Sequence, residues 1–218
     1  MKGAPTHPLA DAVAVYTDGG LLTKNPSDVG GVWAWVAVSA TDRNLGFKSG
    51  VVLCPHPTKK LSNNHMEQIA IVRAIEALPD GWDGVIYTDS DVARIRVESD
   101  YEQVVLGSKR FPAAEKNLYT SISERSKRAV AKLGRQVRFV LLQGHPTKAD
   151  LECGWGAKRN LPVSKWNVWA DRRCVYEKKL YMEKQTLIDL PEVPSWEKPC
   201  PFVFTGTDFR ADATGVPA

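Results

Sequence analysis

The sequence has no apolar run long enough to cross a membrane, and its first residues hold no apolar core of the kind found in secretory signal peptides. Its four cysteines are scattered and form no Cys-x-x-Cys pair, which argues against a structural zinc site and gives no disulfide framework. We therefore expect a protein of the reducing cytoplasm with no membrane partner. The net charge of +4 permits an anionic partner without requiring one.

The length and composition suit one folded domain with additions at its ends. The chain has 218 residues, of which 43% are hydrophobic, so an adequate core is expected. We expect residues 1–12 to form a loose leader and residues 13–180 the folded domain. Residues 181–218 hold several prolines that break any long element, and we expect them to form a Pro-rich extension.

The chain is organised around residues 13–20, which open apolar and β-branched and then reach Asp18, Gly19 and Gly20. Such a run predicts a buried strand that leaves the sheet at Asp18. A half-buried carboxylate needs a donor or a cation, and glycines beside it leave room for a ligand. Taken alone, the segment could also be a strand-ending turn with a hydrogen-bonded aspartate.

The remaining pattern predicts an α/β fold. Residues 32–39 alternate in the manner of a strand, and residues 45–53 follow closely, so the first three strands favour an antiparallel meander. A helix apolar nearly all round and a strand ending at Asp89 come next, which implies a right-handed crossover and parallel neighbours. The other expected elements are short helices in 92–106, a helix over 113–133, a strand over 136–143, a loop over 146–163 and a helix over 164–179 capped by Ser164.

Four acidic residues stand where these elements would bring them together. Asp18 and Asp89 end neighbouring strands, Glu67 lies in the first turn of the helix predicted over 66–78, and Asp171 lies in the final helix. Gathered carboxylates raise each other's pKa values, and a divalent cation removes the conflict. Oxygen ligands without a Cys or His cluster suit Mg²⁺ or Mn²⁺. Two such ions about 3.5–4 Å apart can clamp a phosphodiester.

Each acid also has an ordinary structural interpretation. Glu67 follows Asn64 by three residues and could close a capping box. Asp89 could cap a short helix, and Asp171 could pair with Arg172 at the surface. As a set, these interpretations do not explain why two strands end on acids.

Several segments together resemble type I ribonuclease H over roughly residues 13–179. They are Tyr16-Thr17-Asp18-Gly19 with Asn25-Pro26, Ser62-Asn63-Asn64-His65-Met66-Glu67, Tyr87-Thr88-Asp89-Ser90, Gly144-His145 and Asp171. The resemblance implies a five-stranded mixed sheet flanked by helices. It also implies a monomeric endonuclease that cleaves the RNA strand of RNA–DNA hybrids with two Mg²⁺ ions, leaving 5′-phosphate and 3′-hydroxyl ends.

The resemblance assigns roles to individual residues. Asp18 would bridge both ions, Asp171 would help hold the ion that activates water, and Glu67 with Asp89 would hold the ion at the leaving 3′-oxygen. His145 would assist proton transfer or product release at the rim, and the alternative is a rim histidine without a role. The residues expected to contact substrate within the matched segments are Gly19, Asn25, Ser62, Asn63, Asn64 and Ser90. Ser62 to Asn64 could read 2′-hydroxyls in a shallow minor groove, or cap the helix, or both.

The chain departs from the family in two places. The segment between His145 and Asp171 is longer than usual, which makes Asp150 a competitor for the role of Asp171. We expect this segment to be a substrate-facing flap with Trp155 on a glycine hinge and Lys158 near phosphate; a passive insertion is the alternative. In place of the basic handle of many relatives, residues 107–112 offer a short basic spot. Arg125, Lys127, Arg128, Lys132 and Arg135 could substitute or form a solvated helix face.

Two other functions fit the same residues. One is a nuclease of the same fold class that acts on DNA, against which the Ser62-Asn63-Asn64 segment speaks because it can read ribose. The other is a non-catalytic nucleic-acid-binding module. Clustered negative charge argues against a pure phosphate binder.

Overall fold

A computed structural model of the chain describes residues 7–54, 60–98 and 113–187. These residues fold around a five-stranded mixed sheet. The strand order is β3-β2-β1-β4-β5. Strands β1 (Ala12–Leu21), β2 (Gly30–Ser39) and β3 (Asn44–Leu53) form the antiparallel meander, and β4 (Val85–Thr88) and β5 (Arg138–Leu141) extend it in parallel. No helix among the described residues is long and apolar enough to span a membrane.

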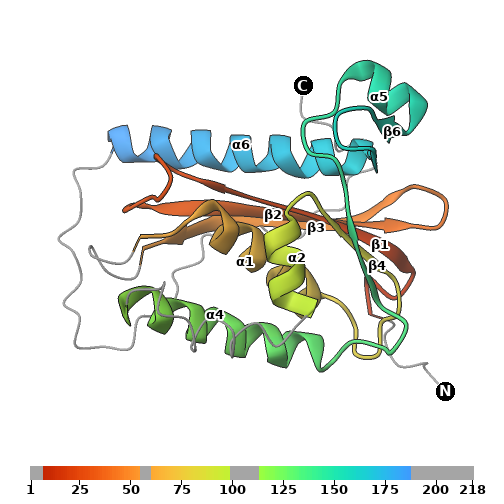
Figure 1. Ribbon diagram of the computed structural model, residues 1–218, viewed down its shortest axis with the longest axis horizontal. Coiled ribbons are helices and arrows are strands. Elements are labelled where there is room, and N and C mark those ends of the chain that lie inside the picture. Colours follow the sequence, from red (N-terminus) through yellow and green to blue (C-terminus); the bar gives the residue numbers. More distant parts are fainter. Residues whose placement is uncertain (1–6, 55–59, 99–112, 188–218) are drawn as a thin grey trace.

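Helices cover both faces of the sheet and confirm the predicted architecture. Helices α1 (Asn63–Ala77), α2 (Asp91–Glu98) and α4 (Ala113–Val130) lie on one face. The long helix α6 (Lys165–Leu187) lies alone across the other face (Figure 1).

Strand β2 shows how the sequence pattern builds two cores. Trp33, Trp35 and Ala37 point into the larger core under α1, whereas Val32, Ala34, Val36 and Val38 point toward α6. Because successive side chains alternate between the faces of a strand, one run of apolar residues serves both layers. The strand is buried along almost its whole length, because helices cover both faces of the sheet there.

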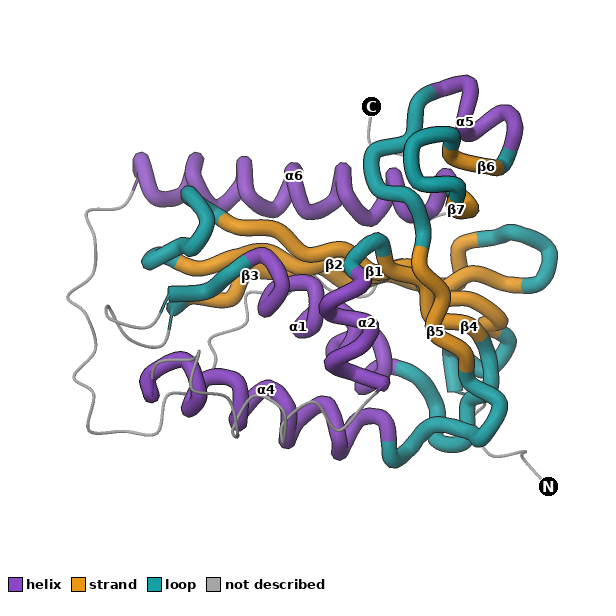
Figure 2. Tube along the Cα trace, viewed as in Figure 1, coloured by secondary structure: helices purple, strands orange, loops and turns teal. Residues whose placement is uncertain are grey.

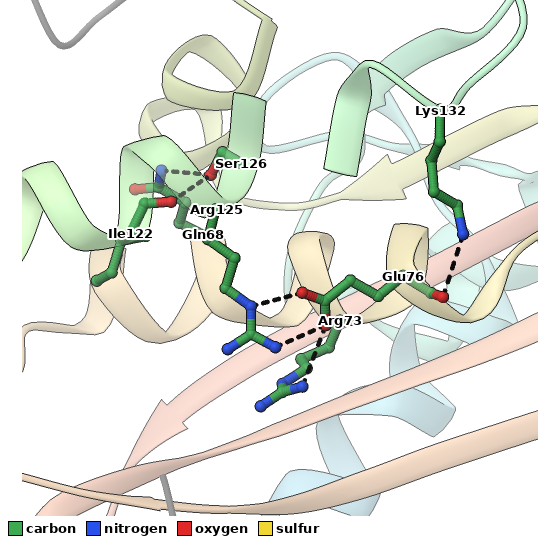
Figure 3. A network of polar contacts seen from close by, with 7 residues as sticks. All are labelled: Gln68, Arg73, Glu76, Ile122, Arg125, Ser126 and Lys132. Carbon is green, nitrogen blue, oxygen red and sulfur yellow. Dashed lines mark hydrogen bonds and ion pairs between the residues drawn. The ribbon is translucent and has the colours of Figure 1, made fainter. Parts of the chain in front are cut away.

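Polar contacts fix α4 onto α1 at two places (Figure 3). Glu76 accepts hydrogen bonds from Arg125 at 2.5 and 2.7 Å and from Arg73 at 3.1 Å, and these side chains are partly exposed. In the buried interior, Gln68 donates to the Ser126 hydroxyl at 3.0 Å. Arg125 therefore binds α1 rather than standing free on the surface. It is one of the basic residues that could have substituted for the basic handle of many relatives.

Four expectations about elements are wrong in detail. The segment 146–163 is not a loop: it contains α5 (Lys148–Cys153) and a small ribbon of β6 (Trp155–Gly156) and β7 (Leu161–Pro162), seen in Figure 2. Helix α1 begins three residues earlier than predicted, and α6 runs past residue 179, so the predicted boundary at residue 180 falls inside it. Residues 1–6 of the expected leader lie outside the described residues, but its second half is not loose, because Leu9 is buried in the core and β1 begins at Ala12. Residues 188–218 of the Pro-rich extension and the basic spot at 107–112 also lie outside the described residues.

Candidate active site

Three of the predicted acids meet at one edge of the sheet. Carboxylate oxygens of Asp18, Glu67 and Asp89 all lie within 4.8 Å of one another. Asp18 is 7% and Glu67 is 4% exposed, and Asp89 is half-buried. Among the described residues, this is the one group of His, Cys, Asp or Glu side chains so arranged.

The strand register explains why Asp18 and Asp89 meet. Strands β1 and β4 are paired in parallel as far as Tyr16 and Tyr87, and each aspartate lies two residues beyond its tyrosine. The expectation that β1 leaves the sheet at Asp18 is wrong, because β1 continues to Leu21 against β2 with Asp18 opposite Ala34. Beyond Tyr16, β1 is therefore still paired with β2 along one edge, whereas its other edge is no longer paired with β4 and borders the site.

Glu67 reaches the site because α1 passes very close to β1. A Cβ atom on Gly19 would lie 2.5 Å from the Glu67 backbone nitrogen, so only glycine allows this approach. The helix is capped at Ser62, whose backbone N–H donates to the His65 Nδ1 atom at 3.0 Å. Burial lowers the pKa of His65 to about 4, with Arg96 adding to the shift, so the ring is a neutral acceptor. Glu67 is the fifth residue of the helix rather than part of its first turn, and the alternative interpretation, a capping box of Asn64 and Glu67, is wrong because the box is formed by Ser62 and His65.

The three carboxylates perturb one another strongly. Burial, followed by the charges of Asp89 and Asp171, raises the pKa of Asp18 well above its usual range. Burial and the charges of Asp18 and Asp89 do the same to the pKa of Glu67. Burial also raises the pKa of Asp89, against the opposing hydrogen bond from Asn167. The Glu67 Oε2 atom is buried and has no hydrogen-bond partner among the described residues. These are the conditions under which a divalent cation lowers the energy of a site.

Asp171 lies on α6 at the open side of this cluster. Its charge contributes to the raised pKa values of Asp18 and Glu67, and its Oδ2 atom lies 3.9 Å from the Nδ1 atom of His145. The buried Ser49 hydroxyl on β3 donates to Glu177 at 2.7 Å and accepts from Arg173 at 2.8 Å. These bonds hold α6 in position two residues from Asp171.

The competing acid, Asp150, has a different role. It lies in α5, where it accepts the backbone N–H groups of Ala157 at 3.0 Å and Thr147 at 2.9 Å. These two donors lower the pKa of Asp150, as expected for a carboxylate that caps backbone. Asp150 is absent from the cavity that the other acids line.

A cavity of about 520 Å³ opens over the acids. It is lined by the four acids and by five other residues predicted for the site: Gly19, Asn63, Ser90, His145 and Lys158. Four other predicted substrate residues do not line it: Asn25, Ser62, Asn64 and Trp155. The indole N–H of Trp155 donates to Asn160 at 2.7 Å, and its neighbours Gly154 and Gly156 end α5 and pack on Gln143. In this conformation the glycines on either side of Trp155 have structural roles, and the Trp155 ring does not reach the cavity.

Comparison with known protein families identifies the family of this chain. A model of the RNase H family, described as RNase H, matches residues 10–159, which is more than half of the chain. The chain belongs to the RNase H family. This family consists of ribonuclease H enzymes, and the match contains Asp18, Glu67, Asp89 and His145. Asp171 and α6 follow the matched region.

The chain is similar to solved RNase H structures at low sequence identity, and it shares the fold of LC9-RNase H1. LC9-RNase H1, described as a type 1 RNase H with the type 2 active-site motif, is 18% identical, with a TM-score of 0.51 over 76% of this chain and 71% of that one. RNase H1 from the halophilic archaeon Halobacterium salinarum NRC-1 is 19% identical, covering 61% and 86% of the two chains, with a TM-score of 0.43. LC11-RNase H1 in complex with an RNA/DNA hybrid is 20% identical, covering 60% and 85%, with a TM-score of 0.38. No curated protein matches the chain.

Sequence reasoning missed several residues that surround this RNase H site. Asn167 donates to Asp89 at 3.4 Å, and the Cys174 thiol donates to the Asp18 carbonyl oxygen at 3.4 Å. Val175 and Lys178 line the cavity beyond them. All four lie three to seven residues from Asp171 along α6. The helical repeat counted from Asp171 could therefore have found them.

Proposed function

We propose that this RNase H family member is a metal-dependent endonuclease that hydrolyses the RNA strand of RNA–DNA hybrids, leaving 5′-phosphate and 3′-hydroxyl ends. The observation that carries the proposal is the group of three carboxylates within 4.8 Å, in a chain that the RNase H family model matches. A buried acidic group of this kind costs stability unless it binds cations, so its presence argues for a function.

The donor set fits Mg²⁺, with Mn²⁺ as a substitute, because all its ligands are carboxylate oxygens. In our proposal Asp18 contacts two ions, Glu67 and Asp89 hold one of them, and the more open Asp171 holds the other. When bound, the ions supply Lewis-acid stabilisation of the attacking and leaving oxygens. The orphaned Oε2 atom of Glu67 and the raised pKa values of Asp18 and Glu67 support this assignment.

His145 lies at the rim of the cavity, beside Asp171. Its side chain is 84% exposed, and its backbone is in the left-handed region with φ of 49°. The ring faces Asp171 at 3.9 Å, and Gly144 lies so close to the Asp89 carboxylate that a Cβ atom would collide with it. We assign His145 to proton transfer or product release beside Asp171.

Recognition of ribose is assigned to the start of α1. Asn63 lines the cavity, and its amide donates to the Glu67 Oε1 atom at 3.4 Å. In our proposal the same side chain also contacts the substrate. Ser62 and Asn64 flank it and complete the proposed contact with 2′-hydroxyls in the minor groove. Gly19 and Ser90 line the same cavity, and the Ser90 hydroxyl also accepts the Ala93 N–H at the start of α2.

The proposal is tested by incubating the protein with a labelled RNA–DNA hybrid, an RNA duplex and a DNA duplex, with Mg²⁺ and with EDTA. We expect the RNA strand of the hybrid to be cut in Mg²⁺ alone, and its products to be substrates for enzymes that need 5′-phosphate and 3′-hydroxyl ends. Cutting of the DNA duplex instead would favour a DNA-directed nuclease. Binding of the hybrid without any cutting would favour a non-catalytic module.

A further inference from the structure

The insertion between His145 and Asp171 has regular secondary structure and is hydrogen-bonded to one buried residue, Gln143. Gln143 follows β5 and is 2% exposed. Its backbone N–H donates to the Pro162 carbonyl at 2.9 Å, and its Oε1 atom accepts the Arg159 backbone N–H at 2.8 Å. Its Nε2 atom donates to Asp150 at 3.4 Å. One glutamine therefore ties the beginning, the ribbon and the end of the insertion to the sheet.

Asp150 and Gly156 complete this anchor. Asp150 is 8% exposed and accepts backbone N–H groups from both sides of the insertion, at Thr147 and Ala157. Gly156 packs against the Gln143 amide so closely that a Cβ atom would collide with it. The insertion stands above the first turns of α6 (Figures 1 and 2). These contacts hold the chain between Gly156 and Pro162 in one place before any ligand arrives.

The anchored stretch presents two cations to the acidic cavity. Lys158 and Arg159 are exposed and line the cavity that contains Asp18, Glu67 and Asp89. Within the described part of the chain, neither side chain is in an ion pair. Two other lysines of the region behave differently, since Lys148 pairs with Glu152 at 3.7 Å and Lys165 pairs with Asp42. Lys158 and Arg159 are thus kept near the acids while their charges remain available to an anion.

We infer that the insertion is a preformed phosphate clamp: Lys158 and Arg159 bind backbone phosphates next to the cut bond, and Gln143 is the residue that positions them. The inference rests on the proposed nuclease function, because the cavity floor is where the cut phosphodiester would lie. Lysine and arginine are the side chains that bind phosphate, and arginine can do so with two parallel hydrogen bonds. Because the anchor exists in the free protein, little ordering of the insertion is needed on binding.

The test compares Lys158→Ala/Arg159→Ala with the parent enzyme on a labelled hybrid at several salt concentrations in Mg²⁺. Loss of two phosphate contacts should raise KM about tenfold and reduce the slope of log KM against log salt by about 2, with a smaller change in kcat. The matched control is Lys148→Ala, because Lys148 lies on the same insertion but does not line the cavity. Unchanged KM and slope in the double variant, in a parent that cuts the hybrid, would overturn the inference.

Gln143→Ala tests the positioning role. It should raise KM and flatten the salt slope in the same direction as the clamp variant, and it should add little to Lys158→Ala/Arg159→Ala because both act through the same contact. A purely structural role would instead lower stability while leaving the salt slope of the folded enzyme at its parent value. If Gln143→Ala does not fold, Gln143→Glu replaces it: this change keeps an acceptor for the Arg159 N–H but loses the donor to Asp150, and an unchanged KM and salt slope in it would overturn the positioning role.

Fluorescence anisotropy with the same hybrid separates failure of the clamp from failure of the proposed function. If the parent cuts no substrate but Lys158→Ala/Arg159→Ala still weakens binding and its salt dependence, the clamp stands and the nuclease proposal falls. If the parent cuts the hybrid and binding by the double variant is unchanged, the clamp falls and the nuclease proposal stands.

Discussion

At the scale of single residues, the acids of the site are buried close together, and this raises their pKa values. Glu67 is 4% exposed beside two aspartates, and burial and these neighbours raise its pKa well above the usual range. In the metal-free protein, the unfolded chain therefore loses this proton at a lower pH than the folded chain does. The ionised cluster is a net cost to the fold, and one that bound cations can offset.

Removing the charge of Glu67 should therefore stabilise the metal-free protein. In EDTA, Glu67→Gln should melt at a higher temperature than the parent, by an amount that grows as pH rises above about 4.3, where unfolded glutamate ionises. The difference should vanish at lower pH, where the parent residue is protonated in both states. Thermal melts from pH 3 to pH 8 provide the measurement, and a parent that is the more stable of the two at neutral pH would contradict the assigned electrostatics.

Gly19 should be intolerant of any side chain. Gly19→Ala places a Cβ atom 2.5 Å from the Glu67 backbone nitrogen and must push α1 away from β1. We expect a stability loss of about 1–3 kcal/mol with displacement of Glu67. The matched control is Gly20→Ala, whose Cβ atom would meet only the Val32 side chain at 3.4 Å. Urea unfolding that ranks Gly20→Ala as the more damaging change would show that the close approach is misplaced.

The two asparagines at the start of α1 should govern the choice of sugar. Asn63→Ala with Asn64→Ala should slow hybrid cleavage and reduce the preference for ribose over deoxyribose at the cut position, because the proposed minor-groove contacts are lost. The helix itself is capped at Ser62, so only a small loss of stability is expected. The measurement is kcat/KM on hybrids that carry single deoxyribose substitutions. Unchanged discrimination would remove both residues from the recognition of ribose.

At the scale of elements, the α1–α4 contact contains a buried and an exposed polar pair, and they should contribute differently. Ser126→Ala leaves the amide of fully buried Gln68 without its acceptor and should cost about 1–3 kcal/mol. Glu76→Ala breaks partly exposed ion pairs and should cost about 1 kcal/mol or less, falling as salt rises. Urea unfolding at low and high salt compares them, and a larger loss for Glu76→Ala, or a salt-sensitive loss for Ser126→Ala, would contradict this assignment.

Elements with a local signal were predictable, and elements built by distant contacts were not. The alternation in β2 and the apolar stretch of α1 predicted both elements because burial repeats along them. The insertion gave no such signal, since its anchor joins Gln143 to Asp150, Arg159 and Pro162 across the chain. The end of α6 was also placed too early, because the helix continues to Leu187.

At the scale of the whole molecule, the sheet topology concentrates opposite charges on one edge. The parallel pair β1 and β4 brings Asp18 and Asp89 together, and the crossover helix α1 adds Glu67 from the adjacent layer. Lys158 and Arg159 from the insertion and Lys178 from α6 stand around this acidic floor. The acidic residues of the cavity floor were predictable, because Asp18 and Asp89 follow predicted strands and Glu67 lies in a recognisable motif. In the cationic rim Lys158 was expected from the sequence, whereas Lys178 required the three-dimensional arrangement because it comes from a separate element.

The cleavage rate of Asp18→Asn in Mg²⁺ tests whether the acidic group around Asp18 is the site at which the RNA strand of a hybrid is cut. We expect no detectable RNA-strand cleavage, because the carboxylate proposed to contact both ions is gone, in a protein whose circular dichroism matches the parent. The same preparation should melt at or above the parent temperature in EDTA, since one buried charge has been removed. Turnover near the parent rate would contradict the assigned site.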